Sequence, residues 1–495
     1  MTSSNPSTSS GSSRATSRAD SYSPDRRTAL ILTGTGADGV YHAGVLRALH
    51  EAGIKIDLVG GRGIGAVGAV LTAVDGGARL WDPNGLWRSR AVPHLYGWRW
   101  PVRALIALAA ALAALLASPL LFFALALFVY PIGLLLGMAN LDAGSWLIGA
   151  YAQLLTSAFA PDALPTWLPR LIAALVLAAL LILVLGTLVA WRHAPLRRRS
   201  RGAPGWALLG APLDASRAMT HFTSAVWDLL KGGAALKAPA ADELSRRYGE
   251  LLDENLGQPG FRELLLVVHD IDACRDLVFG LVREPFRRAL FPPPSVSGLR
   301  RAEAFDLAGL ANRHLVDVLR AALSVPGLAE AALLSFAPDA YWRGEVHRLV
   351  DRPASLGRLL EEAAAAGAEQ VLIVSASPEL RGPHGLARPR VDPIGRLSDH
   401  VAASEAAALG DAVRHLQHRF RAIYQIRPQH NPVGAFDLHG AYDEKSDRTH
   451  PLPELMERGY EDAYREFIEP VVAASGDSLS SQLPHHTASP QGKLD

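Results

Sequence analysis

Two long stretches without charge constrain this chain more than any other feature. No charged side chain occurs from Ala104 to Leu141 or from Leu171 to Ala190. A helix needs about 20 apolar residues to cross a bilayer, and each stretch is long enough for one crossing. A pair of buried core helices is the alternative, but soluble cores rarely need uncharged runs of this length. The pattern predicts spans at about 104–137 and 171–191, within an insertion at 103–192.

Arginines flank both stretches on their outer sides. They are Arg88, Arg90, Arg99 and Arg103 before the first run, and Arg192, Arg197, Arg198, Arg199 and Arg201 after the second. Positively charged flanks stay on the cytoplasmic side of a membrane. We therefore expect a protein integral to the cytoplasmic (inner) membrane, with both termini facing the cytoplasm. The segment from Gly144 to Pro161 is expected to be an external or interfacial loop.

Charge and cysteine content exclude other classes. The 495 residues include 49 Lys and Arg against 48 Asp and Glu, a net charge of +1, and no basic domain that would bind nucleic acid. Cys274 is the single cysteine, so no intramolecular disulfide can form. Residues 1–27 and 475–495 are rich in small polar residues and are expected to be a disordered arm and tail.

Two acidic clusters are candidates for a metal site. Near His439, a loop contains Asp437, Asp443, Glu444 and Asp447, whose carboxylates suit a hard cation. The spacing of a calcium-binding loop is absent, so a hydrogen-bonded turn before a helix at 452–468 is favoured. The second cluster, His269, Asp270 and Asp272, is interpreted as structural. We expect no metal and no cofactor.

The first folded segment predicts a strand, a glycine turn and a helix. Residues 29–33 are apolar, residues 34–39 are rich in glycine, and residues 40–52 have apolar side chains at helical spacing. A second unit follows, with a strand at 54–59, a turn at 60–65 and a small-residue helix from Ala66 to Val74. Strand, sharp glycine turn and helix is the layout of a nucleophile elbow. The central residue of this elbow is Gly63, which has no side chain.

This order of motifs resembles the opening of the patatin-like phospholipases. The match comprises the glycine turn, then Gly44-Val45-Leu46 with Leu49, then Glu51, Gly53, Ile54 and Asp57, and then the elbow. Weaker likenesses follow at 264–272, 321–326, 341–346 and 359–375. The resemblance implies an α/β fold, an α/β/α sandwich with a mostly parallel sheet that a transmembrane helical hairpin interrupts. Its two parts are expected at 28–102 and 202–387, with an extension at 388–474.

The resemblance also implies a site, and this chain departs from it. The family resembles a serine esterase with a Ser–Asp dyad and a glycine turn that binds the oxyanion. On this alignment Gly63 is a vacant nucleophile position, flanked by Gly61 and Gly65, and Arg343 is a vacant aspartate position. The oxyanion turn consists of Gly34, Thr35, Gly36, Asp38 and Gly39, where an anionic Asp38 would repel the developing oxyanion.

Two functions remain open at this point. The first is a catalytically silent patatin-like protein of lipid metabolism that binds membrane lipid at the cytoplasmic face, with a protein partner left undetermined. The alternative is an active lipid acyl hydrolase with a displaced nucleophile. Ser324, Ser375 and Ser377 are the candidates for that nucleophile, although serines at such positions more often cap or turn the chain.

Overall fold

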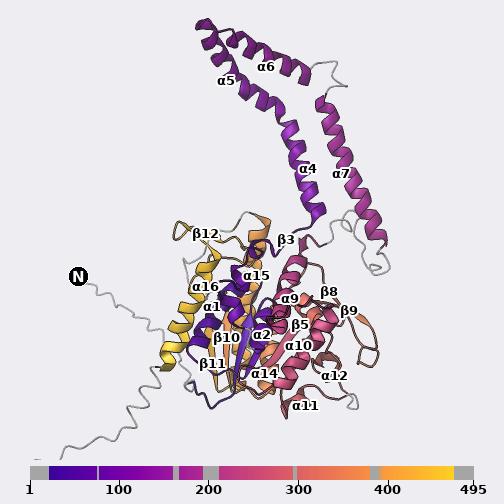
Figure 1. Ribbon diagram of the computed structural model, residues 1–495, viewed down its shortest axis with the longest axis vertical. Helices are drawn as coiled ribbons and strands as arrows, with labels where there is room; N and C mark the ends of the chain where they lie inside the picture. The colour runs from indigo at the N-terminus through magenta and orange to yellow at the C-terminus, as the bar shows by residue number, and fades with distance from the viewer. Residues whose placement is uncertain are drawn as a thin grey trace, which may run out of the picture. The chain divides into compact units, whose positions relative to one another are not determined.

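The chain forms two compact units (Figure 1). The computed structural model describes residues 22–74, 77–159, 167–192, 211–293, 298–378, 390 and 392–472. Of the arm expected at 1–27 it describes residues 22–27, and the tail expected at 475–495 lies outside the described residues. Unit 1 comprises Met1–Tyr96 and Ala215–Asp495, and unit 2 comprises Gly97–Asp214. Unit 1 is therefore built from two separate parts of the chain.

A mostly parallel sheet forms the centre of unit 1. Its strands run in the order β11-β10-β1-β2-β5-β6-β7, and β9 pairs with both β5 and β8. The five strands from β11 to β5 are parallel, whereas β6 and β9 run antiparallel to β5. The strands are β1 (Thr28–Thr33), β2 (Leu58–Gly61), β5 (Glu263–Asp270), β6 (Arg275–Leu281), β7 (Ala304–Asp306), β8 (Ala332–Ser335), β9 (Val346–Val350), β10 (Gln370–Ser375) and β11 (Ala422–Ile426).

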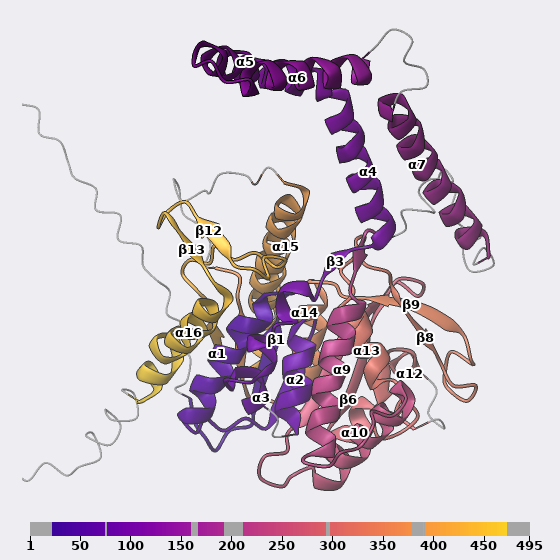
Figure 2. The same ribbon diagram turned by 45° about the horizontal axis from the view of Figure 1, so that its top comes forward.

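Helices cover both faces of this sheet (Figure 2). Alternate side chains of β1 point to opposite faces, as the period of a strand requires. Leu30 and Leu32 belong to one buried core, and Ala29 and Ile31 belong to the other. The first core is completed by α1 (Asp38–Glu51), α2 (Gly65–Ala73), α9 (Ser216–Lys231), α10 (Ala241–Asn255), α13 (Leu315–Ala322) and α16 (Leu452–Ala463). The second is completed by α11 (Phe286–Leu290), α14 (Ser355–Ala365) and α15 (Pro393–Leu416).

The remaining elements of unit 1 are short. They are α3 (Ala78–Trp81), η1 (Leu86–Arg88), η2 (Val92–His94), α12 (Arg300–Glu303), η4 (Gln417–Arg419), β12 (Ala441–Asp443), β13 (Arg448–His450) and η5 (Tyr464–Ile468). The α/β class with a mostly parallel sheet is confirmed. The second strand is shorter than expected, because Ile54 to Asp57 lie outside it and β2 begins at Leu58.

The segment expected as a C-terminal extension contributes directly to the sheet. Strand β11 pairs with β10 in parallel register, from Gln370↔Ala422 to Val374↔Ile426. Helix α16 packs closely on α1, because a Cβ at Gly44 would lie 1.8 Å from the Met456 carbonyl oxygen. Glycine is needed there because two helix backbones approach each other directly.

Unit 2 contains four helices in its described part. They are α4 (Trp100–Leu116), α5 (Ser118–Met138), α6 (Ala143–Phe159) and α7 (Trp167–Arg192), and β3 (Gly97–Trp98) pairs with β4 (Leu213–Asp214). The helix expected at about 104–137 is broken at Ala117, just before the Pro119 that sits in the first turn of α5. Residues 144–159, expected as a loop, are helical in α6. Only α5, among the described helices, is long and apolar enough to cross a membrane.

Within unit 2 the helices pack in two pairs. Helix α4 packs with α7, and α5 packs with α6. The α5–α6 contact is tight because Gly133 faces Gly144, where a Cβ would lie 2.4 Å from the Gly133 carbonyl oxygen. The Tyr151 hydroxyl donates to the Phe122 carbonyl oxygen at 2.6 Å and fixes the same pair. Small residues at such contacts are typical of helix pairs in membranes.

Candidate functional site

The two glycine turns of the sequence lie beside each other at one edge of the sheet. Strands β1 and β2 are parallel neighbours, and each ends in a turn that opens a helix, α1 or α2. The Ile64 amide of the second turn donates to the Gly34 carbonyl oxygen of the first at 2.9 Å. The carboxyl edge of a parallel sheet is where ligand sites of α/β proteins are built. The sequence therefore brings the predicted oxyanion turn and elbow together.

Gly63 lies at the head of the elbow with no room for a side chain. Its φ of +54° is in the left-handed region, which favours glycine. A Cβ there would lie 2.1 Å from the Gly34 carbonyl oxygen. The space that a nucleophile would occupy is therefore filled by the backbone of the neighbouring turn.

The acidic residue that faces this point is Asp351. Its Oδ2 atom would lie 3.0 Å from a Cβ at Gly63, and its backbone amide, directly after β9, donates to the Ser324 carbonyl oxygen at 3.1 Å. Arg343, the position expected to replace the aspartate, lies elsewhere. It is exposed in the turn before β9, where it has a φ of +46°. The elbow thus has an aspartate neighbour, at Asp351 and not at Arg343.

A fully buried arginine holds this aspartate. Arg62, with 0% of its surface exposed, directs Nε at Asp351 Oδ1 (3.1 Å) and Nη2 at Asp351 Oδ2 (2.7 Å). The same guanidinium binds both oxygens of Glu405 from α15, with Nη2 to Oε1 at 2.6 Å, and donates from Nη1 to Thr33 Oγ1 at 2.9 Å. The Thr35 hydroxyl also donates to Glu405, at 3.3 Å. One cation therefore clamps two carboxylates from distant segments.

Burial and pairing act in opposite directions on these groups. Burial alone would lower the pKa of Arg62, but Asp351 and Glu405 outweigh it and the pKa is raised. Burial raises the pKa of Asp351, although the Arg62 charge opposes that shift. A guanidinium keeps its charge at any physiological pH, so the clamp is permanent. Asp351 thus accepts two N–H bonds from Arg62.

The predicted oxyanion turn packs against the backbone at Ala435. The Ala37 amide donates to the Ala435 carbonyl oxygen at 2.8 Å, and a Cβ at Gly36 would lie 2.0 Å from that oxygen. Within the turn, Asp38 Oδ2 accepts the Thr35 amide at 2.8 Å. Burial, offset in part by that bond, raises the pKa of Asp38 to about 7, so its charge is only partial near neutral pH.

The serines considered above as displaced nucleophiles form hydrogen bonds with backbone groups. The buried Ser324 hydroxyl lies 2.8 Å from the Arg320 carbonyl oxygen and 3.0 Å from that of Glu330. Ser375 Oγ accepts the Ser377 amide at 3.2 Å, and both residues are buried. In the described part of the chain none of the three hydroxyls is bonded to a histidine or carboxylate.

The acidic clusters form bonds within the protein. Asp437 pairs with Arg390 at 2.6 Å, and Asp270 accepts from His347 Nδ1 at 2.5 Å. Asp272 pairs with Arg348 at 2.6 Å. Among the described residues no group of three or more His, Cys, Asp and Glu side chains is arranged to hold a metal ion.

A cavity of about 260 Å³ lies apart from the elbow. Phe291, Phe305, Phe336 and Tyr341 are among its apolar and aromatic lining residues, with Arg301, Asp306 and His314 as charged or titratable members. It shares no lining residue with the Arg62 network.

Sequence reasoning missed the three residues that define the elbow's charge. Arg62 was visible as a charged residue inside a glycine turn, whereas Asp351 follows the short strand β9, whose sequence Val-His-Arg-Leu-Val is a weak strand signal. Glu405 had no signal, because it lies in an alanine-rich helix with two other acidic residues, Asp399 and Asp411.

Comparisons with known proteins find short local matches. No family model matches the chain. Lysophospholipase nte1 of Emericella nidulans is 56% identical over 41 residues, which is 8% of this chain and 3% of that protein. Patatin-like phospholipase domain-containing protein 6 of Homo sapiens is 58% identical over 43 residues, again 8% of this chain and 3% of that protein. The chain thus matches only a few per cent of the length of these relatives.

The alignment with a solved structure, VipD from Legionella pneumophila, covers 90% of this chain and 67% of the VipD chain. The TM-score is 0.30 and the identity is 12%. A likeness at this level carries no argument about fold or function.

Proposed function

We propose that this chain is a membrane-anchored, catalytically silent member of the patatin-like phospholipase family that binds lipid at the cytoplasmic face of the membrane. The names of its relatives describe enzymes that act on phospholipids or lysophospholipids. Membrane lipid is therefore the ligand class that we assign to this chain.

The proposed absence of catalysis at the elbow is supported above all by the bonds of Arg62 to Asp351 and Glu405. Hydrolysis by a Ser–Asp dyad needs a nucleophile, a free carboxylate and unpaired amide donors. Here the nucleophile position is Gly63, the carboxylate of Asp351 is bonded to Arg62, and the Ala37 amide is bonded to Ala435. Each requirement is blocked by a different part of the chain, so one substitution is not expected to restore activity.

Membrane anchoring is supported by the surface of unit 2. Helix α5 exposes large apolar side chains, including Leu120 at 74% and Phe123 at 67% of their surface. Exposed apolar surface of this extent marks contact with a partner or a membrane. Arginines on both flanks of the insertion favour the cytoplasmic side for both ends.

The first test measures hydrolysis and lipid binding together. The purified full chain is incubated with vesicles of phosphatidylethanolamine and phosphatidylglycerol, and with lysophosphatidylcholine. We expect flotation with the vesicles, and fatty-acid release no faster than for the matched variant Asp351→Asn. Release that falls at least tenfold in Asp351→Asn would overturn silence, because it would mean that Asp351 acts as a base.

The second test concerns topology. A reporter active only in the cytoplasm, fused after Asp495, is expected to be active, and a reporter active only outside the membrane is expected to be silent at the same point. The reason is the arginine content of both flanks. Reporters after Asn140 serve as the comparison and are expected to give the opposite pattern. An external signal at Asp495 would contradict the proposed orientation.

A further inference from the structure

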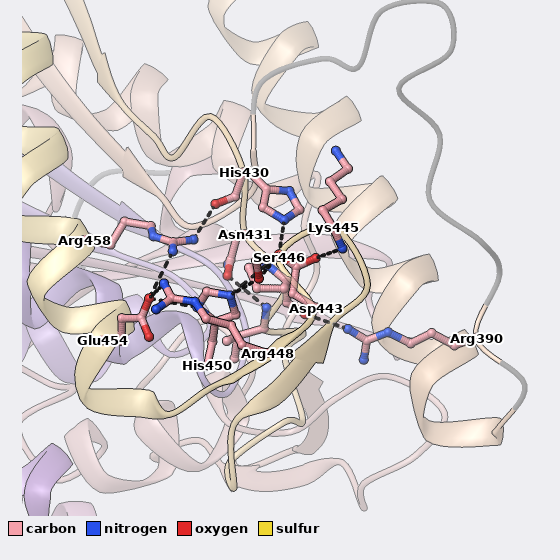
Figure 3. Close-up of polar contacts among 12 residues, drawn as sticks. Arg390, His430, Asn431, Asp443, Lys445, Ser446, Arg448, His450, Glu454 and Arg458 are labelled. Carbon is pink, nitrogen blue, oxygen red and sulfur yellow. Dashed lines mark hydrogen bonds and ion pairs between the residues drawn. The ribbon is translucent and has the colours of Figure 1, made fainter.

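A second polar cluster lies away from the elbow, in the hairpin β12–β13 and the first turn of α16 (Figure 3). Ser446 lies in the hairpin turn, His450 ends β13, and Glu454 lies in the first turn of α16. Asp443 ends β12 on the other side of the turn. The short segment from 443 to 454 therefore brings a hydroxyl, an imidazole and two carboxylates together.

The hydrogen bonds of this cluster connect Glu454 to His450 and His450 to Ser446 in series. Glu454 Oε1 lies 2.8 Å from His450 Nδ1, and Ser446 Oγ lies 2.9 Å from His450 Nε2. An ionised carboxylate can only accept, so Glu454 fixes the proton of a neutral His450 on Nδ1. Nε2 is then an acceptor that faces the serine hydroxyl. This is the arrangement of nucleophile, base and orienting acid that activates a serine.

The exposure of these side chains fits the roles of base, orienting acid and nucleophile. The side chain of His450 is 5% exposed, and Glu454 is held by Arg448 Nη2 at 2.7 Å. Ser446 itself is exposed. The base is therefore fixed in orientation while the hydroxyl can be reached from solvent.

Asp443 is the one competing partner of the serine among the described residues. Its Oδ2 atom lies 2.9 Å from Ser446 Oγ and 3.6 Å from His450 Nε2. Asp443 also accepts from His430 Nε2 through Oδ2 at 3.1 Å and from the Lys445 amide through Oδ1 at 3.1 Å. Burial alone would raise the pKa of Asp443, but these bonds lower it to about 2, so the group stays ionised. The Ser446 hydroxyl needs only to rotate toward His450, and both carboxylates then stabilise the imidazolium that proton transfer creates.

Donors for a developing oxyanion lie next to the hydroxyl. The backbone amides of Ser446 and Asp447 form no hydrogen bond to any residue in the described ranges. Asp447 has a φ of +52°, which turns the chain sharply directly after the nucleophile. Amides of the nucleophile and its successor supply this function in serine hydrolases on other folds.

We propose that Ser446, His450 and Glu454 form a serine nucleophile site, separate from the elbow, that cleaves small water-soluble carboxylic esters. Ser446 Oγ attacks the ester carbonyl carbon while its proton passes to His450 Nε2. The C–O bond to the leaving alcohol then breaks, and His450 returns the proton to that alcohol. Water, deprotonated by the same imidazole, attacks the acyl carbon. The bond from that carbon to Ser446 Oγ then breaks, the imidazolium returns its proton to Oγ, and the carboxylic acid leaves. The site goes beyond the proposed lipid-binding function and does not depend on it, and the catalytic silence proposed above concerns the elbow alone.

The test uses a fluorophosphonate probe on the folded full chain, followed by peptide mapping. We expect labelling at Ser446 that is lost in Ser446→Ala and on heat denaturation. Ser404→Ala is the matched control, because the Ser404 hydroxyl donates to the His400 carbonyl oxygen and should leave labelling unchanged. His450→Gln and Glu454→Gln should each slow labelling at least a hundredfold, with release of p-nitrophenol from its acetate falling in parallel.

Three results would overturn the site. They are an unlabelled wild-type chain, labelling that persists in Ser446→Ala, and equal labelling rates in the wild type and His450→Gln. Melting temperatures of the variants separate loss of the base from loss of the fold. Failure here leaves the phospholipid assay untouched, because that assay is read against Asp351→Asn and not against Ser446→Ala.

Discussion

Replacing Arg62 by methionine is expected to lower the free energy of unfolding by about 3–5 kcal/mol, the cost of leaving buried charge unpaired. The change would strand the carboxylates of Asp351 and Glu405, which are 4% and 2% exposed. Denaturant unfolding of the detergent-solubilised chain measures the loss. Arg414→Met is the matched control, because Arg414 is 71% exposed and its ion pair with Asp411 contributes less than about 1 kcal/mol.

The pH dependence of this loss distinguishes charge from packing. Without Arg62, burial raises the folded-state pKa of Asp351 with no cation to oppose it. A carboxyl whose folded pKa is raised loses stability as pH rises from its unfolded value, near 4, through its folded value. The difference from the wild type should therefore shrink toward pH 4 and grow toward neutral pH. A pH-independent loss would point to packing instead.

A compensated variant completes this series. Arg62→Met combined with Asp351→Leu and Glu405→Leu removes all three charges and should recover most of the lost stability, because apolar replacement of a buried ion pair is often neutral. If the triple variant is as unstable as Arg62→Met, unpaired charge is not the cause.

Gly63→Ser is expected to lack detectable phospholipid hydrolysis and to be less stable than the wild type. Without a working nucleophile and base, turnover in a serine hydrolase falls by about a millionfold. The new side chain would meet the Gly34 carbonyl oxygen, and Asp351 would remain bonded to Arg62. The left-handed backbone alone adds about 1–3 kcal/mol of strain. Fatty-acid release and thermal unfolding measure the two effects.

Gly53→Ser isolates the backbone part of that cost. Gly53 has a φ of +64°, and a Cβ added to it would meet no described atom within 4 Å, so a serine there has the strain without the collision. The excess loss in Gly63→Ser then measures the contact with Gly34. Adding Arg62→Gln to Gly63→Ser should release Asp351, and activity is expected only in such combinations. Robust hydrolysis by Gly63→Ser alone would contradict the view that Arg62 disables the aspartate.

Local patterns predicted the parts of the fold that local physics decides. The apolar run at 29–33 became β1, buried on both faces, and both glycine turns open helices that begin at Asp38 and Gly65, within two residues of the expected starts at 40 and 66. A short continuous apolar run that ends in turn residues is typical of a strand buried on both faces. Pro119, which interrupts the uncharged run, lies in the first turn of α5 directly after the break at Ala117, although the run as a whole predicted a single span.

The site depended on contacts that no local pattern encodes. Arg62 meets Asp351 and Glu405 across 289 and 343 positions of the chain. Arg62 follows β2 of the parallel sheet, whereas Asp351 follows β9, which runs antiparallel to β5. Glu405 comes from helix α15, whose sequence has no sign of its partner. The Ser446 cluster differs, because its members lie within a dozen positions. There the missing information was geometric: a hairpin turn and a helix start had to meet at hydrogen-bond distance.

The position of β1 in the sheet has a consequence for synthesis of the chain. Its neighbour β10 pairs with it through Thr28 and Gln370, which are 342 positions apart. At about 5–20 residues per second, a ribosome needs roughly 20–70 s to deliver that partner after β1 emerges. Throughout this interval an apolar strand has an unpaired edge, which is a template for aggregation. The nascent amino-terminal segment should therefore depend on a holding chaperone. Folding is expected to be slow, because neighbouring strands of the sheet are far apart in the sequence.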